Sequence, residues 1–64
     1  MIKYEYSRHN AQGPAARACK SAAQAWALAF ADLATGQALP VRITDGKIKY
    51  GSLKIIEIWK AAGN

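Results

Sequence analysis

One alanine-rich stretch decides the expected fold: residues 14–34 read PAARACKSAAQAWALAFADLA. Alanine is the best helix former and proline suits the first helical position, so we expect one long helix over this stretch. Gly36 is its expected C-terminal stop, because glycine readily takes the left-handed conformation that ends helices. The apolar stripe expected to be buried consists of Ala15, Cys19, Ala22, Ala23, Trp26, Phe30 and Leu33. Leu28 lies outside this stripe, among polar residues.

The residues before this helix predict a strand and a loop. Residues 2–7 alternate between apolar and polar side chains and include two tyrosines, which is typical of a half-buried strand. Residues 8–13 are polar and end in glycine, so we expect them to form a loop.

The residues after Gly36 predict a β-hairpin. Residues 39–44 and 47–50 both alternate, and Asp45-Gly46 between them is a strong hairpin signal because both positions tolerate a positive φ. The side chains that we expect to meet the helix are Ile2, Tyr4, Tyr6, Leu39, Val41, Ile43, Ile48 and Tyr50.

Residues 53–59, LKIIEIW, allow two interpretations as a strand. Gly51 marks either a bulge in one long strand or, in the interpretation we prefer, a second tight turn that makes a three-stranded meander. Such a strand would be apolar on both faces, with Ile55 and Trp59 on one of them. Because strands of that kind are normally buried on both faces, we expect a second copy of the chain or another protein to cover one face. The alternative is a strand wedged under the end of the helix, with Trp59 half exposed.

The predicted fold class is therefore α+β: one long helix on a small antiparallel sheet, in the order β-α-β-β(-β). Sixty-four residues suffice for one domain, residues 1–64, with little room for a deep catalytic pocket. We expect no signal peptide, and the longest apolar run is far shorter than a membrane span. A single cysteine excludes an intrachain disulfide and favours the reducing cytoplasm.

The residues that carry chemistry do not predict an enzyme. Cys19 and His9 are the only candidates for a nucleophile and its base, and Cys19 is better explained as a small apolar side chain in the helix stripe. One cysteine and one histidine cannot make a structural zinc site. We therefore expect no catalytic, metal-binding or cofactor-binding residues, and no cofactor.

The basic residues carry more information, since the formal net charge is +5. The predicted hairpin places Arg42, Lys47 and Lys49 on one sheet face, and Lys3 can join them from the first strand. Such a patch meets phosphates or an acidic protein, or it only keeps an open sheet face soluble. The candidate binding residues are Lys3, Arg42, Lys47, Lys49, Lys54 and Tyr50, and the candidate apolar association surface is Leu28, Ile55 and Trp59.

The order of elements resembles the small phage-encoded anti-CRISPR proteins, in which a strand, a helix across a sheet and a hairpin follow one another. The matching segments are residues 2–7, 14–34 and 41–59. The resemblance implies a non-enzymatic inhibitor, in the bacterial cytoplasm, of a nucleic-acid-handling protein or ribonucleoprotein complex such as a CRISPR effector. Many of these inhibitors are acidic mimics of nucleic acid, whereas this chain is basic. Two other hypotheses are a small dimeric nucleic-acid-binding regulator and an accessory subunit of a larger assembly.

Overall fold

The computed structural model describes residues 1–9 and 12–63. Its elements follow in the order β-β-α-β-β-α: β1 (Ile2–Arg8), β2 (Ala15–Cys19), α1 (Ala22–Thr35), β3 (Ala38–Asp45), β4 (Ile48–Gly51) and α2 (Ser52–Ala61). The four strands form one antiparallel sheet in the order β2-β1-β3-β4. The longer helix, α1, packs on this sheet, which confirms the predicted α+β class.

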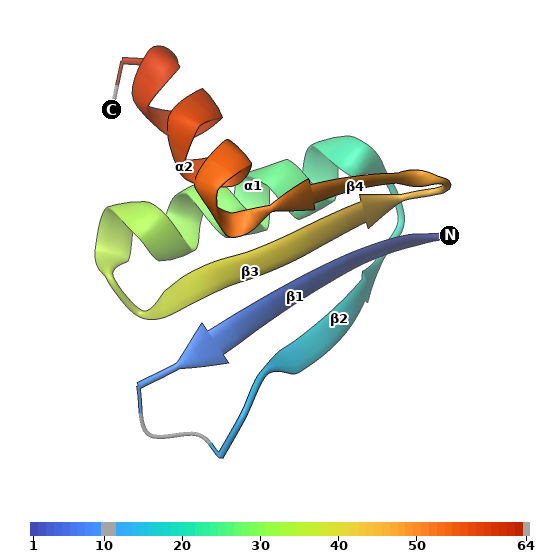
Figure 1. Ribbon diagram of the computed structural model, residues 1–64, viewed down its shortest axis with the longest axis horizontal. Helices are drawn as coiled ribbons and strands as arrows, with labels where there is room; N and C mark the ends of the chain where they lie inside the picture. Colours follow the sequence, from blue (N-terminus) through green and yellow to red (C-terminus); the bar gives the residue numbers. More distant parts are fainter. Residues whose placement is uncertain (10–11, 64) are drawn as a thin grey trace.

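The molecule has two layers and measures 30 × 29 × 18 Å. Figure 1 shows α1 running behind the sheet and α2 leaving from the end of β4. Side chains from the sheet and from both helices share one core, in which each is at most 1% exposed: Tyr4, Ala25, Ala29, Ile43 and Ile55. Both helices therefore cover the same face of the sheet, which we call the inner face. The opposite, outer face is covered by no other part of the described chain.

The first part of the predicted long helix is a strand, so that prediction was wrong for residues 14–21. Residues 15–19 form β2 and pair with β1, with Arg17 opposite Tyr4. Pairing with β1 satisfies the backbone of this segment, and that outweighs the helix preference of alanine, which is worth less than about 1 kcal/mol per residue. Arg8 belongs to β1, and residues 10 and 11 of the predicted loop lie outside the described residues.

Helix α1 begins where a capping pattern lies in the sequence. The side chain of Ser21 accepts a hydrogen bond from the Gln24 backbone N–H at 3.1 Å, and Gln24 Oε1 accepts one from the Lys20 N–H at 2.7 Å. These bonds satisfy donors that the first turn of a helix leaves without partners. The helix ends as predicted at Gly36, whose φ is 72° and whose N–H donates to the Asp32 carbonyl at 2.8 Å.

The hairpin of β3 and β4 is confirmed, but its turn residues are Gly46 and Lys47 rather than Asp45 and Gly46, because Asp45 ends β3 and pairs with Ile48. A β-bulge also changes which β3 side chains point inward. Glu5 pairs with Arg42, whereas the next residue, Tyr6, pairs with Pro40, so Val41 is the extra residue. The alternation is interrupted at this point. Pro40 is consequently buried, while Leu39 is 50% exposed instead of facing the helix as predicted. Ile48, also predicted to face the helix, is 55% exposed.

The predicted last strand, residues 53–59, is a helix, so both strand interpretations were wrong. The buried or half-buried residues of α2 are Ser52, Ile55, Ile56, Ile58 and Trp59, and all but Ile58 recur at the spacing of one helix face. Ile55 is fully buried in the core, and Leu53 is 84% exposed. A helix gathers on one side the apolar residues that a strand would divide between two faces. As a helix, this segment has no second apolar strand face that a partner would need to cover.

A partly buried polar pair, Tyr4 and Asp32, joins β1 to α1. The hydroxyl of Tyr4, a residue that is 1% exposed, donates a hydrogen bond of 2.7 Å to Asp32 Oδ2. Burial, and after it the hydrogen bond to Asp32, raises the pKa of Tyr4 well above its ordinary value of about 10. The phenol therefore stays protonated and acts as a donor that holds the Asp32 carboxylate in place.

Candidate functional site

The outer face of the sheet gathers three of the predicted binding residues. Side chains that are paired across neighbouring strands point to the same face. Thr44 of β3 pairs with Lys3 of β1 and with Lys49 of β4, and Arg42 lies two residues before Thr44 on the same strand. Lys3, Arg42 and Lys49 therefore share this face, across β1, β3 and β4.

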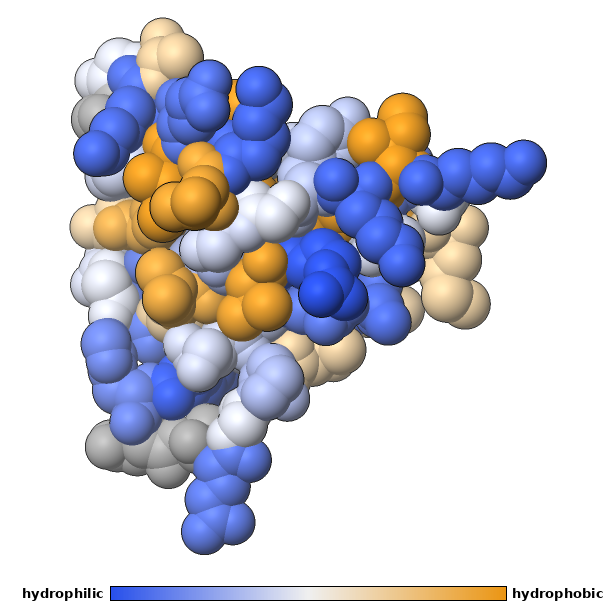
Figure 2. Space-filling model, in the orientation of Figure 1, coloured by the Kyte–Doolittle hydropathy of each residue, from blue (hydrophilic) through white to orange (hydrophobic). Residues whose placement is uncertain are grey.

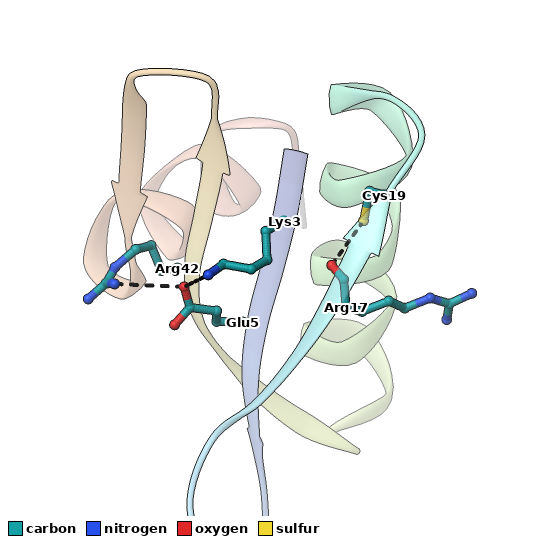
Figure 3. Close-up of polar contacts among 5 residues, drawn as sticks. All are labelled: Lys3, Glu5, Arg17, Cys19 and Arg42. Atoms are coloured by element: carbon teal, nitrogen blue, oxygen red, sulfur yellow. Dashed lines mark hydrogen bonds and ion pairs between the residues drawn. The ribbon is translucent and has the colours of Figure 1, made fainter. Parts of the chain in front are cut away.

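One carboxylate lies between two of these cations. Figure 3 shows Glu5 between Lys3 and Arg42, with its Oε1 atom 3.6 Å from Lys3 Nζ and 3.7 Å from the nearer terminal nitrogen of Arg42. The Glu5 side chain is 18% exposed, against 44% for Lys3 and 46% for Arg42. Both cations keep further N–H donors for an anion in solution, because an ammonium has three and a guanidinium five. We call Lys3, Glu5, Arg42 and Lys49 the outer charged cluster.

Small residues border this cluster. Ala18 pairs with Lys3, Ala16 pairs with Glu5, and Gly51 pairs with Arg42. All three are exposed. The basic side chains are longer than these neighbouring residues. A flat or gently curved polyanion can therefore reach them without steric hindrance.

The other predicted binding residues lie elsewhere. Lys47 is exposed in the turn of the hairpin, next to the cluster but outside the paired strands. Lys54 lies on α2 and forms an ion pair of 3.7 Å with Glu57. Tyr50 pairs with Ile43 and so points to the inner face, where its ring lies 5.0 Å from that of Trp26. Tyr50 therefore does not stack on a ligand bound at the outer face.

The predicted apolar association surface is not a common exposed surface. Ile55 is fully buried, and Leu28 and Trp59 are half-buried. The exposed apolar side chains include instead Leu39 on β3 and Leu53 on α2. Figure 2 shows hydrophobic side chains over α2 and the first part of β3, and a further hydrophobic patch among the hydrophilic side chains towards the β3–β4 hairpin. In that hairpin Ile48, which is 55% exposed, lies between Lys47 and Lys49 in the sequence.

The side chains of Cys19 and His9 form hydrogen bonds with different backbone carbonyls. The Cys19 thiol is half-buried and donates to the Arg17 carbonyl at 3.7 Å. His9 Nε2 donates to the Gly36 carbonyl at 3.0 Å, which ties the end of β1 to the end of α1. No cluster of three metal-ligating side chains occurs in residues 1–9 and 12–63. Within the same ranges, neither helix has the length and apolar character needed to cross a bilayer.

Comparison of the chain with protein-family models, with curated proteins and with solved structures found no match. The assignment of a function therefore depends on the surface chemistry described above.

Arg17 was not predicted from the sequence as a candidate site residue. A helix over residues 14–34 would have turned Arg17 towards solvent, on the polar side of that helix. In β2 it lies opposite the buried Tyr4, on the inner face. The capping pattern at Ser21 and Gln24 was the available signal, because a helix that starts there leaves residues 15–19 free to form a strand.

Proposed function

We propose that the protein is a non-enzymatic binding protein that contacts phosphate groups of nucleic acid within a nucleic-acid-handling complex of the bacterial cytoplasm. The observation that carries this proposal is the outer charged cluster: Lys3, Arg42 and Lys49 lie on one uncovered sheet face with a single carboxylate, Glu5, among them. Cations that contact phosphates release the counterions condensed on a nucleic acid, and this release drives binding without base recognition.

The shape of the surface supports the same proposal. The bordering residues Ala16, Ala18 and Gly51 leave the three cations accessible. Arginine and lysine bind phosphate through several N–H donors, and neither Lys3 nor Arg42 uses all of its donors on Glu5. Inhibition of a CRISPR effector, which the anti-CRISPR resemblance implies, is one specific form of this function. The order β-β-α-β-β-α differs from the order on which that resemblance rested, so the proposal depends on the surface alone.

The test is a matched pair of double variants, each of which removes two positive charges. Arg42→Gln with Lys49→Gln changes the outer charged cluster, and Lys54→Gln with Lys60→Gln changes α2. Fluorescence anisotropy with labelled single-stranded and double-stranded oligonucleotides, over a series of salt concentrations, measures binding. At about 50 mM salt, the cluster variant is expected to lose affinity roughly tenfold or more, with a salt slope lower by about 2. The α2 variant is expected to bind like the unmodified protein.

Two results would contradict the proposal. Equal losses for both double variants would mean that only net charge matters, with no defined binding face. Absence of oligonucleotide binding, together with capture from bacterial lysate of a protein complex that resists nuclease, would show that the cluster binds an acidic protein surface instead.

A further inference from the structure

A pocket lies on the inner face, on the side of the sheet opposite the outer charged cluster. Its volume is about 210 Å³, and its walls come from β1, β2 and the C-terminal half of α1. The strands contribute Arg8 and Arg17, the helix contributes Leu28 and Asp32, and Tyr6 forms part of the wall. Because β2 extends the sheet beyond the part that α1 covers most closely, a hollow remains between them.

Two arginines line this pocket, and neither forms an ion pair with a carboxylate of the described residues. Among the described residues, no carboxylate lies within 4.0 Å of the guanidinium of Arg8 or of Arg17. Arg42, on the outer face, is by contrast paired with Glu5. The Arg8 guanidinium lies 5.5 Å from the centre of the Tyr6 ring, a cation–π contact that keeps it over this wall of the pocket. The pocket lining therefore includes two arginines that form no ion pair within the described residues, together with the carboxylate of Asp32.

The rest of the pocket lining supplies a carboxylate and apolar surface. Asp32 uses its Oδ2 atom to accept the hydroxyl of Tyr4, and its second carboxylate oxygen remains an acceptor. Tyr6, whose ring stacks on that of Tyr4 at 5.1 Å, and Leu28 provide apolar surface. A ligand that fits this arrangement has an anionic group at one end, a flat apolar part, and an N–H donor that can reach Asp32. A ligand that is anionic at both ends is disfavoured, because one end would meet the carboxylate.

We infer that this pocket binds a nucleoside monophosphate, with the phosphate held by Arg8 and Arg17 and the base against Tyr6 and Leu28. Two arginines and one carboxylate leave the pocket lining with one net positive charge, and a phosphate group offers oxygens to both guanidinium groups. A base with an amino or imino group supplies the N–H donor for Asp32. The pocket, at about 210 Å³, is smaller than a typical site for a drug-sized ligand, so a bound nucleotide fills it and keeps part of its surface in solvent. The inference is independent of the proposed function, because the two sites lie on opposite faces of the sheet.

The experiment is a titration of the ¹⁵N-labelled protein, followed by NMR, with each of the four common nucleoside monophosphates and with inorganic phosphate. We expect saturable shifts confined to β1, β2 and the C-terminal half of α1, with weaker binding of inorganic phosphate than of the best nucleotide. Arg17→Gln and Arg8→Gln are each expected to weaken nucleotide binding roughly tenfold or more, because each removes charge-assisted hydrogen bonds. Both arginines are exposed, so neither change should disturb the fold, and the spectra of the variants check this.

The control is Lys60→Gln, which removes one exposed positive charge from α2, outside both the pocket and the outer charged cluster, and is expected to leave nucleotide binding unchanged. Shifts confined to the outer charged cluster, shifts that never saturate, or equal losses for Arg17→Gln and Lys60→Gln would overturn the inference. Equal affinity for a dicarboxylate such as malonate would overturn the assignment to phosphate. Failure here is distinguishable from failure of the proposed function, because that function is tested with Arg42→Gln and Lys49→Gln on the opposite face of the sheet.

Discussion

Tyr4 and Glu5 are neighbours on β1, yet they belong to polar networks on opposite faces of the sheet. Tyr4 is 1% exposed and donates one short hydrogen bond, of 2.7 Å, to Asp32. Glu5 lies between two cations at 3.6 and 3.7 Å, distances of ion pairs rather than of close hydrogen bonds. The comparison shows that the depth of burial, more than the type of polar group, decides how much each network contributes to the stability of the fold.

The hydrogen bond from Tyr4 to Asp32 is expected to contribute more to stability than the outer ion pairs, because the Tyr4 side chain is removed from water and Asp32 is half-buried. A buried donor or acceptor that loses its partner costs about 1–3 kcal/mol, whereas an exposed ion pair contributes about 0–1 kcal/mol. The outer network mainly sets the charge that a partner meets. The inner face should therefore respond to substitution with changes in folding, and the outer face with changes in binding.

The largest effect is expected from a core residue of the inner face. Ile43 is fully buried, whereas Leu39, on the same strand, is 50% exposed. Ile43→Ala is expected to lower the free energy of unfolding by about 2–5 kcal/mol, and Leu39→Ala by less than about 0.5 kcal/mol. A chain of this size has a total stability of about 3–10 kcal/mol, so Ile43→Val, expected to cost about 0.5–1.5 kcal/mol, keeps the comparison measurable by urea denaturation. Equal effects at positions 39 and 43 would contradict the bulge at Val41.

The next largest effect on the free energy of unfolding is expected from removing the hydroxyl of Tyr4. Tyr4→Phe leaves Asp32 without its donor and is expected to lower the free energy of unfolding by about 1–3 kcal/mol at neutral pH. Tyr6→Phe is the matched control, because no hydrogen bond of the Tyr6 hydroxyl occurs among the described residues. Urea denaturation of both variants measures the difference. If the two variants were equally stable, the hydrogen bond from Tyr4 to Asp32 would contribute nothing to folding.

Because of Tyr4, the free energy of unfolding is expected to depend on pH in the alkaline range. The pKa of Tyr4 is raised in the folded protein, so folding favours the protonated phenol. Its contribution to stability is therefore complete below the unfolded pKa of about 10 and decreases as the pH rises above that value. Denaturation at several pH values from 8 upwards should show this decrease in the unmodified protein and a smaller one in Tyr4→Phe. Identical pH profiles would mean that Tyr4 is not responsible.

The smallest effect on folding is expected at the outer face. Glu5→Gln is nearly isosteric and removes two exposed ion pairs, so the free energy of unfolding should change by less than about 1 kcal/mol. The same change removes the only carboxylate of the outer charged cluster and should strengthen oligonucleotide binding at low salt. Urea denaturation and anisotropy on one sample measure both effects. Weaker oligonucleotide binding by Glu5→Gln would count against phosphate contact at this face.

Much of the outer face could be predicted from the sequence, and the inner pocket could not. The alternation in residues 2–7 and 47–50, together with Asp45-Gly46, is sufficient to bring Lys3 and Lys49 to one face, because strand pairing preserves alternation. The pocket requires Arg17 to lie on a strand beside β1. Its local sequence, AARAC, favours a helix, and only pairing with β1 changes that preference.

The last segment differs from its prediction for a related reason. Four isoleucine and tryptophan residues in LKIIEIW suit a strand by type, because β-branched and aromatic residues are favoured there. Their spacing suits a helix as well, and in α2 it leaves one apolar side, with Ile55 in the core and Leu53 exposed. The conflict between residue type and residue spacing is resolved by the core, because the helix buries Ile55 without exposing a second apolar face.

By itself the sequence determined the features that depend on local backbone preference. These are the strand that begins at Ile2, the tight turn that begins at Gly46 and the end of α1 at Gly36, where a positive φ or a period of two is required. Only the tertiary structure decided that residues 15–19 form a strand, that Val41 shifts the register of β3, and that residues 52–61 form a helix. The physical reason is that intrinsic preferences differ by less than about 1 kcal/mol per residue. Pairing a strand, or burying one large apolar side chain, contributes more than that.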